Sequence, residues 1–187
     1  MKTLTTLTLL GALALSAPAL ADDSTAPTTT PSAAQQCRTE RSAMGVDLFR
    51  ATYGTNKNKH NAFGKCVSKR ANATDEAATE AKQNAAQECK AERTADPDAF
   101  TTTYGTGKHG ANAYGKCVSQ KAKAKTAETV ADEVEADVSA AKACKTERKA
   151  DPEAFATKYG TNANKRNAFG KCVSKTAKAK AEDTDES

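Results

Sequence analysis

The chain contains one short module three times, and each copy lies between two cysteines. The copies run from Cys37 to Cys66, from Cys89 to Cys117 and from Cys144 to Cys172. The third copy, CKTERKADPEAFATKYGTNANKRNAFGKCVSK, aligns with the second without a gap, and the first has one extra residue before its phenylalanine. All 6 cysteines of the 187-residue chain belong to these copies. The repeat therefore limits the fold to three small units of similar structure.

The first 21 residues, MKTLTTLTLLGALALSAPALA, have the pattern of a secretory signal peptide with cleavage before Asp22. The pattern is a basic start, a short apolar run and small residues before the cleavage point. The apolar run is too short for a membrane span, and no later stretch comes close. We therefore expect a secreted protein, extracellular or associated with the cell surface, with the periplasm as an alternative.

Paired cysteines in an oxidising compartment form disulfides. Six cysteines can pair in many ways, but the repeat favours one disulfide per module. A metal site is the alternative, and it lacks ligands, because the chain has no CxxC sequence and only two histidines. His60 and His109 do not occupy matching places in their copies. We expect no metal site, no catalytic site and no cofactor. The predicted disulfides are Cys37–Cys66, Cys89–Cys117 and Cys144–Cys172.

Large apolar side chains are scarce. From Asp22 onward the chain has one leucine, no isoleucine, seven valines and five phenylalanines, a share far below the roughly 20% under which chains tend toward disorder. Each module therefore has only a miniature core, and units of this size usually need a cross-link. A disulfide that closes a loop of about 29 residues stabilises the folded state by roughly 3.5 kcal/mol on the chain-entropy model. The nine aromatic residues fall three to a module: Phe49, Tyr53, Phe63; Phe100, Tyr104, Tyr114; Phe155, Tyr159, Phe169.

Local signals predict three helical pieces in each module. Asp-Pro supplies an N-cap and a first helical residue in copies two and three, whereas copy one has Met44-Gly45-Val46-Asp47 and should start its middle helix less cleanly. The Phe and Tyr that follow are four residues apart and share one helical face. A glycine then ends the helix, and an asparagine after the polar loop looks like the N-cap of the last piece. The aspartates are Asp96 and Asp151, the glycines are Gly105 and Gly160, and the asparagines are Asn61, Asn112 and Asn167.

Between modules the chain is rich in Ala, Lys and Glu and lacks glycine. The last helix of one module is therefore expected to run directly into the next module, with three modules on alternating sides of a helical rod. A hinge is expected at 72–75, where helix propensity is poor, and Asn72 is a glycosylation acceptor in a eukaryotic host. The prediction is an all-α fold. Its parts are the signal peptide 1–21, a disordered linker 22–36, modules 1, 2 and 3 (37–70, 89–125 and 144–180), connectors 71–88 and 126–143, and an acidic tail 181–187.

Three further patterns have two interpretations each. Val130, Val134 and Val138 form either a short dimer seam or a stripe that packs within the chain, and the second is favoured. A Glu-Arg pair follows the first cysteine of every module. It could act as a ligand clamp, but we favour a structural role as an ion pair or a cap over the disulfide. A lysine before the second cysteine marks either an anion site or a solvated face, and the second is favoured. These residues are Glu40-Arg41, Glu92-Arg93, Glu147-Arg148; Lys65, Lys116, Lys171.

Charge alternates along the chain. The three modules carry +6, +4 and +7, and the two connectors carry −3 and −4. Linked cationic modules would hold anionic surface polymers through several weak contacts at once. The alternative is an interaction repeat that binds an extracellular protein through the polar loops, with the basic charge serving solubility. We expect a binding or structural protein and not an enzyme, because no catalytic motif is present, and specific nucleic-acid binding is not expected because the aromatics are needed inside the modules.

Overall fold

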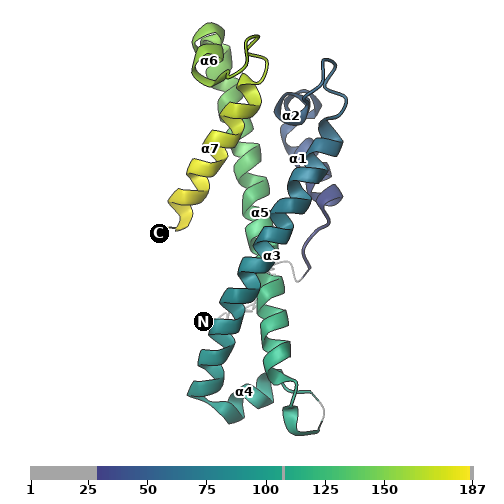
Figure 1. The fold of residues 1–187 in the computed structure, drawn as a ribbon, viewed down its shortest axis with the longest axis vertical. Helices are drawn as coiled ribbons and strands as arrows, with labels where there is room; N and C mark the ends of the chain where they lie inside the picture. The colour runs from purple at the N-terminus through teal and green to yellow at the C-terminus, as the bar shows by residue number, and fades with distance from the viewer. Residues whose placement is uncertain (1–28, 107, 186–187) are drawn as a thin grey trace, which may run out of the picture.

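The computed structural model describes residues 29–106 and 108–185, which form only helices and loops (Figure 1). The all-α prediction is confirmed. The predicted signal peptide and residues 22–28 of the predicted linker lie outside the described residues. The helices are α1 (Ala33–Met44), α2 (Val46–Tyr53), α3 (Ala62–Ala95), α4 (Pro97–Tyr104), the short 3-10 helix η1 (Lys108–Gly110), α5 (Ala113–Ala150), α6 (Pro152–Tyr159) and α7 (Ala168–Asp185). Thus α1 begins within the predicted linker, and α7 continues into the predicted tail.

The connectors are helical throughout, as their composition predicts. Helix α3 runs for 34 residues from module 1 into module 2, and α5 runs for 38 residues from module 2 into module 3. The expected hinge at 72–75 is wrong, because these residues continue α3 without a break. The hydroxyl of Thr74 donates to the Arg70 carbonyl at 2.8 Å and accepts from the Gln36 amide at 3.2 Å, so α1 supports the segment from outside.

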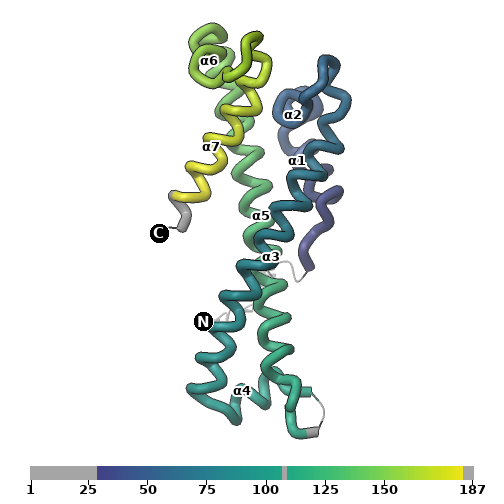
Figure 2. The backbone as a smooth tube through the Cα atoms, viewed as in Figure 1, coloured from purple at the N-terminus to yellow at the C-terminus, as the bar shows by residue number. Residues whose placement is uncertain are grey.

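The long helices fold back on each other instead of forming one rod. Helices α3 and α5 run antiparallel, with modules 1 and 3 beside each other at one end and module 2 at the other (Figure 2). Small apolar faces permit this approach, because Ala81, Ala85 and Ala122 are buried between the two helices. Val130 is also buried, and Val138 packs against the core of modules 1 and 3, so the interpretation of within-chain packing is confirmed for these two valines.

Each module contains the disulfide that the repeat favours, at Cys37–Cys66, Cys89–Cys117 and Cys144–Cys172. The middle helices begin as predicted. Asp96 and Asp151 each accept a hydrogen bond of 2.9 Å from the backbone N–H three residues later. In module 1 the N-cap is Gly45, which has no side chain to offer, and α2 starts without such a bond.

The three modules are unequal in their cores. Modules 1 and 3 share one apolar cluster, which includes both of their disulfides together with Phe49, Phe155 and Phe169. Module 2 has a separate small cluster around Phe100 and its own disulfide. Burial of apolar area is the main stabilising contribution to folding, so the paired modules support each other while module 2 depends on its own cross-link.

Candidate anion-binding cleft

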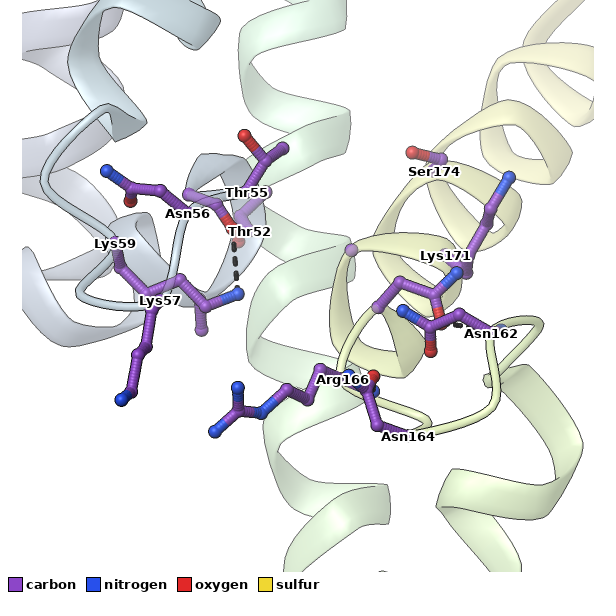
Figure 3. Close-up of a pocket in the computed structure, with 14 residues that line it drawn as sticks. Thr52, Thr55, Asn56, Lys57, Lys59, Asn162, Asn164, Arg166, Lys171 and Ser174 are labelled. Atoms are coloured by element: carbon purple, nitrogen blue, oxygen red, sulfur yellow. Dashed lines mark hydrogen bonds between the residues drawn. The ribbon is translucent and has the colours of Figure 1, made fainter.

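A cleft of about 740 Å³ lies between modules 1 and 3. One wall is the end of α2 and the loop 54–59, and the other is the loop 162–167 and the first turns of α7 (Figure 3). The polar loops that the sequence singled out in copies one and three therefore face each other across one space. The equivalent loop of module 2 lies at the opposite end of the molecule (Figure 1).

The cleft is cationic. Lys57 and Lys59 line it from module 1, and Arg166 and Lys171 line it from module 3, while its lining contains no carboxylate. Within the described residues, the side chains of Lys57, Arg166 and Lys171 have no hydrogen-bond or ion-pair partner. Figure 3 shows Arg166 extending from its loop toward module 1. Four positive charges without counter-charges give the cleft a positive potential.

Asparagine side chains hold both loops. The Asn61 amide accepts from the Thr55 backbone N–H at 3.0 Å and donates to the Thr55 hydroxyl at 2.7 Å. Asn167 makes the same pair of bonds to Thr161, at 3.1 and 2.5 Å. Both asparagines occupy the predicted N-cap positions, but in Asn61 the side chain makes no capping bond. They stabilise the loop instead of the helix end, which explains why threonine follows the glycine in every copy.

The glycines that end the middle helices are needed for close approach and not for a left-handed turn. Gly54 has φ −72°, but a Cβ there would lie 2.7 Å from the Lys59 Cβ. Lys59 itself has φ +60°, and its ammonium donates to the Gly54 carbonyl at 2.7 Å. In module 3, Lys165 has φ +54° and donates to the Gly160 carbonyl at 3.0 Å. A lysine thus closes each loop of the cleft over its glycine.

The two walls meet at Gly170. A Cβ on Gly170 would lie 3.0 Å from the Thr52 carbonyl oxygen, across the boundary between modules 3 and 1. The equivalent glycines of the other modules, Gly64 and Gly115, have nothing within 4 Å of such a Cβ. The glycine at this place in module 3 therefore allows α7 to pack closely against α2 at the cleft.

Below the cleft, Asp137 of α5 anchors module 1. Its Oδ2 atom accepts from the Tyr53 hydroxyl at 3.0 Å, from the Lys69 ammonium at 2.6 Å and from the Arg70 guanidinium at 2.6 Å. Arg70 is 1% exposed and also pairs with Glu40 and, at 3.0 Å, with Glu133. Buried charges persist only when they are paired in this way. The network fixes module 1 on the helix that leads to module 3.

Burial dominates the electrostatics of this network. Desolvation raises the pKa of the Glu40 carboxyl, against the opposing effect of Arg70. Desolvation and the neighbouring carboxylates Asp137 and Glu40 raise the pKa of Tyr53. The Tyr53 phenol therefore stays protonated and donates, at 2.5 Å to Glu40 and at 3.0 Å to Asp137.

The repeated Glu-Arg pair is structural, but its members do not pair with each other. Each glutamate accepts from the tyrosine hydroxyl of its own module, as Glu92 does from Tyr104 at 3.0 Å. The Glu40 carboxylate also lies 3.6 Å from the Cys66 sulfur, which matches the expected cap over the disulfide. Two of the arginines lie on aromatic rings, Arg93 over Tyr114 and Arg148 over Phe169. The expected ion pair within the motif is thus replaced by tyrosine contacts and ion pairs with other cations for the glutamates, and by ring contacts for two of the arginines.

The three candidate lysines have different surroundings. Lys65, Lys116 and Lys171 are all exposed, but only Lys171 lines the cleft. Sequence reasoning placed equal weight on the three because their positions in the repeat are equal. Sequence reasoning did not predict that Lys57, Lys59 and Arg166 lie in one cleft. Their loops come together because α5 runs back antiparallel to α3, and no short sequence pattern indicates this arrangement.

Sequence reasoning also missed Arg70 and Asp137 as parts of this network, although the repeat contains a signal for Arg70. Lys121 of module 2 occupies the place of Arg70 and pairs with Glu92 at 2.7 Å, as Arg70 pairs with Glu40. In module 3 the equivalent residue is Thr176, and Glu147 pairs with Lys158 instead, at 2.8 Å. The basic residue four positions after the second cysteine could therefore have been matched to the module glutamate.

In the described part of the chain, no group of three or more His, Cys, Asp or Glu side chains is placed to hold a metal ion. No helix among the same residues has the length and apolar character needed to cross a membrane. The chain matches no known protein-family model, no curated protein and no solved structure.

Proposed function

We propose that the protein is an exported binding protein that holds anionic polymers in the cleft between modules 1 and 3. The observation that carries the proposal is the cationic lining, with Lys57, Lys59, Arg166 and Lys171 on two facing walls and no carboxylate among the lining residues. Three disulfides suit an oxidising compartment, where anionic surface polymers are the available polyanions.

The proposal differs in one respect from attachment through three equal modules. Two loops act together here, because the shared core and the Asp137 network hold modules 1 and 3 at a fixed separation. A polymer bound to one loop meets the second at high effective concentration, so weak contacts add. Module 2 would then serve mainly to turn the chain from α3 into α5.

We propose that the cleft serves binding and not catalysis. Among the side chains that act as general acids or bases, lysine is present in its lining, whereas histidine, aspartate, glutamate, tyrosine and cysteine are not. Its openness to solvent on the protein surface also leaves a substrate hydrated, whereas catalytic groups act best where water is excluded.

The test is binding of the oxidised protein to a panel of anionic polymers across a salt series, by calorimetry. The double variant Arg166→Gln/Lys171→Gln removes two charges from the cleft, and the control Lys65→Gln/Lys116→Gln removes two from matching helices outside it. We expect binding that weakens with salt and is about tenfold weaker in the cleft variant, a loss of about 1.4 kcal/mol. Equal losses in both variants would exclude the cleft as the site. Salt-insensitive capture of a protein partner, without polymer binding, would favour an interaction repeat.

A further inference from the structure

The cleft loops engage some of their acceptors internally, although the side chains of Asn56, Asn162 and Ser174, which also line the cleft, have no hydrogen-bond partner within the described residues. The Gly54 carbonyl accepts from Lys59, and the Asn164 side-chain oxygen accepts from the Arg166 backbone N–H at 3.1 Å. The Asn167 side-chain oxygen accepts from Thr161, and the Asn162 carbonyl accepts from the Lys165 backbone N–H at 3.0 Å. The unpaired charged groups of the cleft, by contrast, are all donors, so they determine the charge and the acceptors that a ligand must bring.

The unpaired cations point to an anionic ligand that is rich in acceptors. The Lys57 and Lys171 ammonium groups and the Arg166 guanidinium have no partner within the described residues. Ammonium and guanidinium groups donate and never accept. They come from two facing walls, so a group whose oxygens diverge from one centre can accept from both walls, whereas a planar carboxylate presents its two oxygens to one side. Phosphate has the required shape and charge.

The cleft also lacks a surface for rings. No aromatic residue lines it, and the nearby tyrosines are engaged inside the modules, Tyr53 with Glu40 and Tyr159 with Glu147. Proteins hold nucleobases of single strands by stacking them on exposed aromatic side chains. Oligonucleotides would therefore have only their backbone phosphates to offer to this cleft.

Building on the proposed function, we infer that the ligand is a linear chain of phosphate groups without rings. Such a chain carries acceptors and negative charge at every unit, with no hydroxyl between the phosphates of polyphosphate and one hydroxyl per unit in a glycerol-phosphate chain. Its flexibility lets successive phosphates reach Lys57 on one wall and Arg166 on the other. Inorganic polyphosphate and ring-free glycerol-phosphate polymers share this chemistry.

The test compares four classes of polymer at equal charge concentration and fixed salt, by calorimetry with the oxidised full-length chain. They are linear polyphosphate, a glycerol-phosphate oligomer, a sulfated polysaccharide and oligothymidylate, with polyglutamate as a carboxylate control. We expect one or both of the ring-free phosphate chains to bind at least about tenfold more tightly than the others, which corresponds to one charge-assisted hydrogen bond. Binding of polyphosphate alone, or of the glycerol-phosphate chain alone, would identify the source.

Two variants place the ligand in the cleft. Arg166→Gln should reduce phosphate-chain affinity several-fold, and Lys116→Gln, which lies in module 2, should leave it within about twofold. Tighter binding of the sulfated polysaccharide, the oligonucleotide or polyglutamate would overturn the inference about the ligand while leaving the proposed function intact. Absence of binding to every polymer at low salt would overturn both.

Discussion

The Tyr53 hydroxyl lies 3.0 Å from the Oδ2 atom of Asp137, although the two residues are 84 positions apart in the chain. Tyr53 ends α2 at the cleft wall of module 1, and Asp137 lies on α5, which leads into module 3. The same oxygen accepts from Lys69 and Arg70. One carboxylate therefore fixes the position of module 1 relative to module 3, and with it the width of the cleft.

Replacement of Asp137 should strongly destabilise the paired modules. Asp137→Asn removes one of three carboxylates that pair with the guanidinium of Arg70, which is 1% exposed and keeps Glu40 and Glu133. The loss should therefore lie at or below the cost of an uncompensated buried charge, which is about 3–5 kcal/mol. Urea denaturation followed by circular dichroism measures the loss. Glu128→Gln on the same helix is the control, because Glu128 is exposed. Similar stability of the two variants would contradict the anchoring role of Asp137.

The three repeated tyrosines should differ in their contributions. Tyr53 is 7% exposed and donates to two carboxylates, so Tyr53→Phe should lower the free energy of unfolding by about 1–3 kcal/mol. Tyr104 and Tyr159 are half-buried, and each donates to one glutamate near solvent. Their replacement by phenylalanine should cost about 1 kcal/mol or less. Equal effects in thermal unfolding of the three variants would show that the buried network adds nothing.

Glu40 should make stability fall as pH rises. Burial raises the pKa of its carboxyl, so its protonated form favours the folded state. That contribution is full below the unfolded-state pKa and is lost as pH rises through the folded-state pKa. Lysine partners lower the pKa values of Glu92 and Glu147, which gives these two groups a pH dependence of the opposite sign. Both groups are unchanged in a Glu40→Gln variant, so their effect cancels when the variant is compared with the wild type.

Denaturation of the wild type and of Glu40→Gln between about pH 4 and pH 8 isolates this contribution. The wild type should lose stability relative to the variant as pH increases over this range. A difference that is constant, or that moves in favour of the wild type, would show that burial does not govern the ionisation of Glu40.

The three equivalent glycines provide a matched set at the cleft. Gly64→Ala and Gly115→Ala meet open space, and each should stabilise its helix by about 0.5–1 kcal/mol. Gly170→Ala places a Cβ 3.0 Å from the Thr52 carbonyl, so it should gain less or lose stability and should weaken anion binding. Thermal denaturation and polymer binding of the three variants give the comparison. An equal gain at all three positions would mean that α7 is not held tightly against α2.

The disulfide of module 2 should be the most important for local order. Modules 1 and 3 share a core, whereas module 2 has only its own small cluster. Replacing Cys89 and Cys117 by alanine removes roughly 3.5 kcal/mol of loop-closure stabilisation on the chain-entropy model. Hydrogen exchange should then show lost protection in α4. Replacing Cys144 and Cys172 should leave more protection in α6, and the reverse order would contradict the unequal cores.

The repeat predicted the parts of this fold that depend on local sequence. Disulfide pairing follows from the two cysteines in every copy of the repeat. The Asp-Pro starts of α4 and α6 and the continuity of α3 and α5 follow from residues near one another in the chain. Propensity and capping act over a few residues, so the helix starts and the continuous helices could be predicted locally, whereas the disulfide pairing needed the comparison of the three copies.

The pairing of modules 1 and 3 could not be predicted in the same way. Each connector looked like an isolated rod, because the small faces formed by Ala81, Ala85 and Ala122 resemble ordinary helix-forming alanines. Those faces pack on each other only because α5 runs back antiparallel to α3. The cleft depends on that return, so its cations appeared in the sequence as separate solvated charges, and Asp137 appeared as one more acidic residue of a connector.

Amide chemical shifts during titration with linear polyphosphate test the central claim most directly. If modules 1 and 3 form one anion site, residues of the loops 54–61 and 160–167 should shift together with a single dissociation constant, and the module 2 loop should remain unchanged at those concentrations. Shifts spread over all three modules in proportion to their charge, or loops that titrate independently, would contradict the account.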